Sequence, residues 1–123
     1  MPYPQTTDLL TADLIVEDSG DVQRVRLEGR LDSASVVAVE KRFDAATVTC
    51  QKHVIVDLGG VSFMTSPAVR MLVAAAKRMA IAGYILVLLE PQRLVNEYLE
   101  AADIYRLVPV AYSENEAALL LAD

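Results

Sequence analysis

The stretch HVIVDLGGVSFMTSPAVRML (residues 53–72) gives the clearest indication of the fold class, because its pattern predicts a buried strand followed directly by a helix. Its first six residues form a nearly unbroken apolar run, which is typical of a central strand covered on both faces. The glycine pair at 59–60 predicts a tight turn at the carboxyl end of that strand. A helical pattern then begins near Pro67 and continues to about Ala82, with Gly83 as its stop signal. Its inward face is expected to consist of Leu72, Ala75, Ala76 and Met79. The stretch therefore predicts a strand–helix unit of an α/β domain.

The residues before this stretch predict a β-hairpin and a helix. Residues 13–17 and 22–29 read as two strands joined by a DSGD turn, and the second strand alternates apolar and charged side chains. From Ser33 the apolar side chains recur with the period of a helix. Candidate caps for this helix are Asp32, Ser33 and Ser35. Its inward face consists of Val36, Val39, Phe43 and Ala46.

The residues after the stretch predict two more strands and two more helices. The strands are expected at residues 84–89 and 107–111. Residues 91–102 predict a helix that has its proline in the first turn. A last helix follows Ser113, with Glu116 at the spacing of a capping box. The inward side chains of the helix at 91–102 are expected to be Leu94, Val95, Tyr98 and Leu99.

The element order is therefore β-β-α-β-α-β-α-β-α, which predicts a single α/β domain. We expect a small mixed β-sheet that is opened by the hairpin and is largely parallel beyond it, with α-helices packed against it. The length of 123 residues fits one domain, and the apolar content of 54% is enough for a core. Residues 1–11 are expected to form a flexible N-terminus.

Charge and cysteine content exclude several classes of function. The formal net charge of −6 argues against nucleic-acid binding and against an anionic membrane surface as a partner. No apolar run reaches the roughly 18 residues of a membrane span, so we expect no membrane insertion. The only cysteine, Cys50, cannot form an intrachain disulfide. These features predict a cytoplasmic protein.

Residues that would support catalysis or metal binding are sparse. His53 has no second His or Cys at ligand spacing, and no motif places a base beside Cys50. Asp57 lies near a strand end but lacks the acidic pair and the lysine of a phosphoacceptor aspartate site. The glycine pair at 59–60 matches neither of the two common nucleotide-binding motifs. We therefore expect no enzyme activity, no cofactor and no metal ion.

The segment Thr65-Ser66-Pro67 permits two interpretations. In the first, Ser66 is only the N-cap of the following helix, with Pro67 at the first helical position. In the second, the hydroxyl is a phosphorylation site, where an added phosphate would meet free backbone N–H groups and the positive end of the helix dipole. Local physics permits both interpretations.

At this point the chain resembles the STAS family, the domain named for sulphate transporters and anti-sigma-factor antagonists. The resemblance covers about residues 12–121, which we expect to form one STAS-like domain. It is carried by "VRLEGRLDSASV" (25–36), "HVIVDLGGVSFMTSPAVRML" (53–72), "GYILVLLEP" (83–91) and "LVPVAYSENEAAL" (107–119).

The resemblance implies a regulatory protein of the anti-sigma-factor-antagonist type. Such a protein binds an anti-sigma factor with serine kinase activity, is released when that kinase phosphorylates it, and is reset by a phosphatase. Phe63 and Met64 match the family pattern, and Ser66 falls on the phosphorylated serine, with Thr65 as a second candidate acceptor. The departures from the pattern are Thr65 for an Asp, Pro67 for a Ser and Ala68 for a Gly.

The resemblance also implies a partner-binding face around the start of the helix at 66. Val69 and Met64 are equally compatible with an ordinary place in the core. The implied state is a monomer. The expected partner-binding residues are Asp32, Ser33, Met64, Thr65, Ser66, Val69 and Arg70.

A second function is compatible with the same resemblance. Some stand-alone STAS domains are cytoplasmic subunits of ABC lipid transporters, in which a hydroxyl near the same helix start contributes to docking. The altered residues at 65, 67 and 68 favour this alternative.

Overall fold

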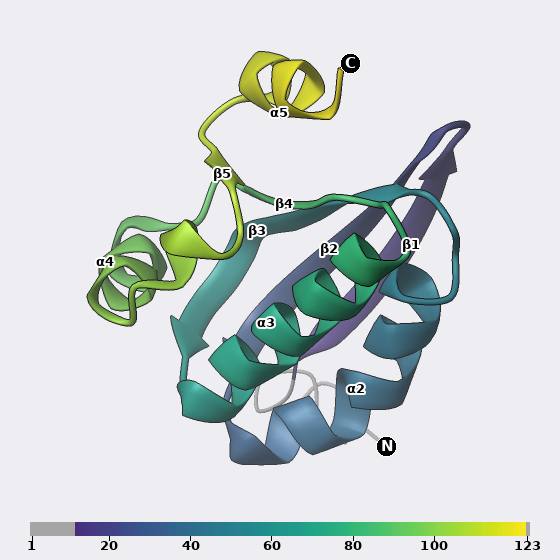
Figure 1. Ribbon diagram of the computed structural model, residues 1–123. Helices are drawn as coiled ribbons and strands as arrows, with labels where there is room; N and C mark the ends of the chain where they lie inside the picture. The colour runs from purple at the N-terminus through teal and green to yellow at the C-terminus, as the bar shows by residue number, and fades with distance from the viewer. Residues whose placement is uncertain (1–11, 123) are drawn as a thin grey trace.

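A computed structural model describes residues 12–122 (Figure 1). The N-terminus at residues 1–11, which was predicted to be flexible, lies outside the described residues. Five strands form one mixed sheet in the order β1-β2-β3-β4-β5. The β1–β2 hairpin is antiparallel and the other strands pair in parallel, which confirms the predicted fold class. The strands are β1 (Asp13–Ser19), β2 (Val22–Leu31), β3 (His53–Met64), β4 (Leu86–Leu89) and β5 (Val110–Ala111). The helices are α2 (Ser33–Thr47), α3 (Ser66–Ile81), α4 (Arg93–Ala101) and α5 (Glu114–Leu121), with a short 3-10 helix η1 (Ile104–Arg106).

The core lies on both faces of the sheet. Helices α2 and α3 lie side by side on one face and bury their apolar stripes there, as predicted (Figure 1). Helix α4 adds Val95 and Leu99 to this main core. Helix α5 covers the other face of β4 and β5 with Ala117. The sheet is thus covered most fully around β3 and β4, where the apolar run at 54–58 lies.

Strand β3 is much longer than the sequence predicted. The glycine pair at 59–60 lies within the strand, so the prediction of a tight turn there is wrong. The pairing with β2 shifts register between Arg26 and Glu28, which absorbs the irregularity without ending the strand. A Cβ atom at Gly60 would lie 2.9 Å from the Cγ atom of Glu28. The glycine is therefore explained by the close approach of β2.

The end of α3 follows the prediction. Ala82 is its C-cap, and Gly83 adopts a φ of +92°, which favours glycine. The amides of Gly83 and Tyr84 donate to the carbonyls of Ala80 and Met79, at 3.0 and 2.9 Å. This pair of bonds satisfies the last carbonyls of the helix.

The elements after α3 are shorter than predicted. Helix α4 begins at Arg93, beyond the predicted proline, and Leu94 is 72% exposed, so its assignment to the inward face is wrong. Strand β5 has only two residues, because the amides of Leu107 and Val108 donate to the carbonyl of Ile104 in the turn that ends η1.

The predicted cap of α5 is confirmed in part. Ser113 Oγ accepts from the amide of Glu116 at 3.1 Å. The Glu116 carboxylate accepts from the amide of Tyr112 at 2.6 Å, not from that of Ser113 as a full capping box requires. Across residues 12–122, no helix combines the length and apolar character needed to span a bilayer.

Candidate functional site

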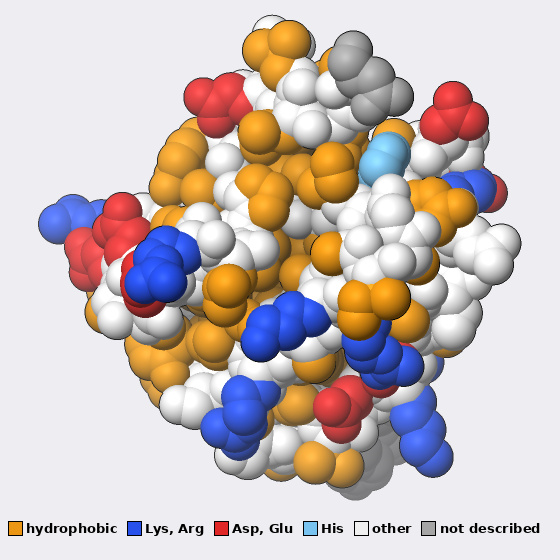
Figure 2. Space-filling model, viewed as in Figure 1, with side chains coloured by type: hydrophobic (Ala, Val, Ile, Leu, Met, Phe, Trp, Pro, Cys, Tyr) orange, Lys and Arg blue, Asp and Glu red, His pale blue; other side chains and the backbone are white. Residues whose placement is uncertain are grey.

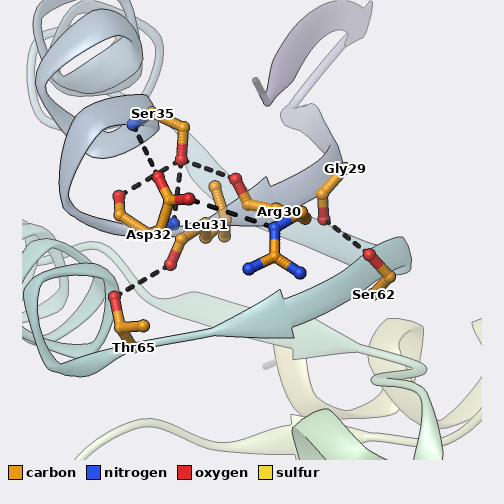
Figure 3. A network of polar contacts seen from close by, with 7 residues as sticks. All are labelled: Gly29, Arg30, Leu31, Asp32, Ser35, Ser62 and Thr65. Atoms are coloured by element: carbon orange, nitrogen blue, oxygen red, sulfur yellow. Dashed lines mark hydrogen bonds and ion pairs between the residues drawn. The ribbon is translucent and has the colours of Figure 1, made fainter. Parts of the chain in front are cut away.

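The candidate site lies where two parallel strands end side by side. Strands β2 and β3 are paired up to Leu31 and Met64, so α2 and α3 begin at the same edge of the sheet. The carbonyl of Leu31 accepts two hydrogen bonds from Thr65, each 3.1 Å long. One comes from the Thr65 amide, and the other comes from Oγ1 (Figure 3). This double contact joins the start of α3 to the segment that carries Asp32.

Asp32 is the cap of α2. Its Oδ1 atom accepts from the amide of Ser35 at 3.0 Å, and Ser35 Oγ accepts from the amide of Asp32 at 2.9 Å (Figure 3). The buried Ser35 hydroxyl also donates to the carbonyl of Arg30 at 2.5 Å. The Ser35 amide bond, followed by smaller contributions that include Arg30, lowers the pKa of Asp32 below its usual value. Asp32 is therefore ionised at neutral pH.

Arg30 and Phe63 form a cross-strand pair of β2 and β3 close to Asp32. The guanidinium carbon of Arg30 lies 4.2 Å from the centroid of the Phe63 ring, a cation–π geometry. Arg30 Nε lies 4.0 Å from Asp32 Oδ2. Phe63 is 40% exposed, which is unusual for a residue in the central strand of the sheet. The edge thus presents a cation, a carboxylate and an aromatic ring together.

The prediction that Ser66 is the N-cap of α3 is wrong by one residue. Thr65 is the N-cap, Ser66 is the first helical residue, and Pro67 follows it. Thr65 makes no side-chain cap bond, because its hydroxyl donates to Leu31 on the neighbouring strand instead. Ser66 is exposed, and its Oγ atom lies 3.1 Å from the hydroxyl oxygen of Tyr98.

The backbone at the start of α3 offers fewer free N–H groups than the sequence suggested. Pro67 has none. The amides of Ala68 and Val69 both donate to the carbonyl of Thr65, at 3.0 and 3.2 Å. An anion at Ser66 would therefore meet less backbone support than at an ordinary helix N-terminus.

Most of the predicted partner-binding residues lie at this edge. Ser33, Ser66 and Arg70 are exposed, while Thr65 and Asp32 are half-buried. The two residues with open alternatives lie deeper in the fold. Met64 is 5% exposed and belongs to the main core. Val69 is half-buried and packs against that core.

Two hollows flank Ser66. A groove of about 410 Å³ runs between α2 and α3, and a smaller hollow of about 190 Å³ lies between the end of β3 and α4. The groove is lined by Ser33, Val36, Val37, Glu40, Pro67, Arg70, Met71 and Ala74. The hollow is lined by Ser62, Phe63, Met64, Leu94, Val95 and Tyr98. Sequence reasoning placed Tyr98 only in the core and missed its contact with Ser66, because 32 residues separate the two in the chain.

The described residues hold no group of three or more His, Cys, Asp or Glu side chains suited to a metal ion. His53 has a structural contact, since its Nδ1 atom accepts from the amide of Ile85 at 3.0 Å. This bond connects the start of β3 to the segment before β4.

Comparison with known proteins extends this description. The STAS domain family model matches residues 13–117. BtrV of Bordetella bronchiseptica, named as a candidate anti-sigma factor antagonist, is 29% identical over 92 residues, which cover 75% of this chain and 79% of BtrV.

Two solved structures have the same fold. An anti-sigma-factor antagonist (STAS) domain protein from Planctomyces limnophilus has 25% identity and a TM-score of 0.76, with coverage of 91% of this chain and 99% of that one. The Bacillus cell fate determinant SpoIIAA in its phosphorylated form has 21% identity and a TM-score of 0.63, with coverage of 89% and 100%. The family match extends over nearly all of the described fold, including both sides of the candidate site, and the chain belongs to the STAS domain family.

Proposed function

We propose that the protein is an anti-sigma-factor antagonist that binds an anti-sigma factor with serine kinase activity and is released from it by phosphorylation at Ser66. The observation that carries this proposal is the position of Ser66. Its hydroxyl is exposed at the first helical position of α3, beside the edge where β2 and β3 end. The name of BtrV supports the same function, and SpoIIAA is a protein of the same fold with a phosphorylated form.

The chain supplies the phosphate acceptor, and the partner supplies the catalytic machinery. Transfer of the terminal phosphoryl group of a nucleoside triphosphate forms a bond between Ser66 Oγ and phosphorus. The bond from that phosphorus to the nucleoside diphosphate breaks, and the hydroxyl proton leaves to a base of the kinase. A phosphatase reverses the modification by hydrolysis. The protein acts in the cytoplasm as a monomer and has no enzymatic activity of its own.

The partner-binding surface surrounds Ser66. It includes the exposed side chains of Ser33 and Arg70 and the groove between α2 and α3, in which Val37 is 77% exposed. Apolar side chains of this kind suit a protein partner, because they provide contact area at the centre of an interface. The charges of Arg70 and Asp32 on either side fix the orientation of that partner.

Phosphorylation changes the electrostatics of this surface. The modification adds about −1.5 to −2 charges at neutral pH. Asp32 is already ionised there, so the phosphate and the carboxylate reinforce one another at the same edge. A partner that docks on the unmodified surface would have to desolvate the phosphate and face this repulsion. The domain itself keeps its fold, because an anion at the first turn of a helix is tolerated.

The test is a quantitative pull-down from the native lysate with tagged wild type, Ser66→Asp and Ser66→Ala, read by mass spectrometry. Ser66→Asp should lose an anti-sigma factor with a kinase fold, with affinity reduced by at least ~1.4 kcal/mol, a factor of ten. Ser66→Ala should retain it, because it removes the acceptor without adding charge. Ser62→Asp is a matched control, since this substitution adds the same charge four residues away. Ser62 is exposed near the end of β3.

The outcomes separate the two functions that the resemblance implies. Equal capture by wild type and Ser66→Asp removes the switch. Enrichment of ABC-transporter subunits by all variants would instead assign the docking-subunit function, with Ser66 as part of the helix start.

A further inference from the structure

The hydroxyl of Ser66 has one side-chain partner in the described part of the chain, and that partner lies on a different helix. Tyr98 comes from α4, and its hydroxyl oxygen lies 3.1 Å from Ser66 Oγ. This bond is the polar contact that joins the start of α3 to α4 at the candidate site. It places a phenolic donor directly at the proposed phosphorylation site.

The Tyr98 ring is held in place by its surroundings. It is half-buried, packs against the main core and lines the hollow at the end of β3 together with Phe63 and Leu94. On either side of it, Val95 and Leu99 are buried and fix α4 to the core. A ring anchored in this way presents its hydroxyl with little loss of conformational freedom.

The Tyr98 hydroxyl is important at the start of α3 because few backbone N–H groups there are available to a phosphate. Pro67 lacks an N–H group and the amide of Ala68 is already bonded to Thr65, so the backbone supplies little to a phosphate at Ser66. Arg70 lies one turn further along the same helix and is exposed. Among the described residues, Tyr98 provides the neutral hydroxyl group that already contacts Ser66.

We propose that Tyr98 is a positioning residue for the modification of Ser66, a role that rests on the proposed function above. In the unmodified chain, its hydroxyl holds the Ser66 hydroxyl at the exposed edge. In the phosphorylated chain, the same hydroxyl donates to a phosphate oxygen. Helix α4 and its exposed Leu94 thereby become coupled to the state of Ser66.

The chemistry of the two states forces a change in this bond. Between two hydroxyl groups, either oxygen can donate. A phosphate dianion has acceptor atoms only, so Tyr98 must then be the donor. The terminal oxygens lie two bonds beyond Ser66 Oγ, so a rotation of the exposed phosphoserine side chain brings one of them to the anchored Tyr98 hydroxyl. A donor that favours the dianion lowers the second pKa of the phosphate.

The experiment measures that pKa in the full chain, with phosphoserine incorporated genetically at position 66. Phosphorus NMR follows the pH titration of the phosphate, whose ordinary second pKa is about 6. We expect Tyr98→Phe to raise this pKa by at least about 0.3 units relative to the chain that retains Tyr98. Tyr112→Phe is the matched control, because it also removes a tyrosine hydroxyl that contacts α4. The Tyr112 hydroxyl donates to Asn96 Oδ1 at 3.0 Å and not to Ser66.

A second measurement leaves Tyr98 unchanged and therefore does not depend on how the Tyr98→Phe variant folds. In the chain with phosphoserine at position 66 and ¹³C-labelled tyrosine, the Cζ resonance of Tyr98 should shift with the same midpoint as the phosphate. The proposal is overturned if Tyr98→Phe leaves the phosphate pKa unchanged, if Tyr112→Phe raises it equally, or if the Tyr98 resonance does not follow the titration. Neither a kinase nor a partner is needed, so failure here leaves the partner-binding test of the proposed function intact.

Discussion

Replacing Thr65 by Val tests the contact that assembles the candidate site. The substitution keeps the branched shape and removes only the hydroxyl that donates to the Leu31 carbonyl at 3.1 Å. That carbonyl keeps its second donor, the Thr65 amide, so it is not left without a partner. A neutral hydrogen bond contributes about 0.5–1.5 kcal/mol net, and with the carbonyl still paired we expect a loss of about 0.5–1 kcal/mol.

The assay is urea unfolding followed by far-UV circular dichroism. The midpoint should fall without a change in slope, because the variant exposes the same surface on unfolding. For a domain of this size, about 1 kcal/mol corresponds to a decrease in Tm of roughly 3–5 °C. Thr65→Ser, which retains the hydroxyl, should recover most of the loss.

Thr49→Val is the control for the loss of a threonine hydroxyl as such. Thr49 Oγ1 donates to the carbonyl of Ala45 at 2.8 Å, but this contact is exposed at the end of α2 and water replaces it. We expect its cost to be at most a few tenths of a kcal/mol. Wild-type stability for Thr65→Val, or an equal loss for Thr49→Val, would refute the claim that the Thr65 hydroxyl stabilises the contact between the start of α3 and Leu31.

Two further predictions concern capping and burial. Because the pKa of Asp32 is lowered in the folded state, its ionised form stabilises the domain above its ordinary pKa of 3.8, and this contribution is lost as the pH falls through the folded value. The difference in Tm between wild type and Asp32→Ala should therefore be full at pH 7 and shrink below about pH 4, and a difference that is independent of pH would contradict this assignment. On α4, Val95→Ala should cost about 2 kcal/mol because Val95 is buried, whereas Leu94→Ala should change the free energy of unfolding by less than about 0.5 kcal/mol. Chemical denaturation of both variants checks this pair, and equal losses would mean that the face of α4 is assigned incorrectly.

Leu94 is one of several exposed apolar side chains in the C-terminal part of the chain. Figure 2 shows apolar side chains gathered on one face in the region of α4, β5 and α5. Leu107 and Leu119 are 56% and 75% exposed. The helical period of the sequence assigned Leu94 to the core, because period alone does not show how far a neighbouring element reaches. Here α4 faces the core through Val95 and Leu99, and Leu94 lies at the hollow beside the end of β3.

Those features that depend on neighbours in the chain were predictable from the sequence. The hairpin, the inward faces of α2 and α3 and the glycine after α3 all follow from local periodicity and backbone preference. The role of Gly60 was not predictable, because it depends on the approach of Glu28 from β2 across a shifted register. A turn and a strand irregularity require the same residue type, and only the pairing distinguishes them.

The candidate site shows the same division. Residue type gave three candidate caps for α2, and the structure selects Asp32 among them. Residue type predicted Ser66 as the N-cap of α3, whereas the structure has Thr65 there. The Thr65 hydroxyl does not cap the helix but donates to the carbonyl of Leu31, 34 residues earlier in the chain. The contact between Ser66 and Tyr98 has no sequence signal at all, since it depends on the position of α4 beside the end of β3.

The most direct test of the central claim compares the affinity of one partner for two forms of the same chain. The anti-sigma factor captured by the wild type is titrated calorimetrically against unmodified chain and against chain with phosphoserine at position 66. We expect the phosphate to weaken binding at least about tenfold, which corresponds to ~1.4 kcal/mol. Equal affinity for the two forms would contradict it.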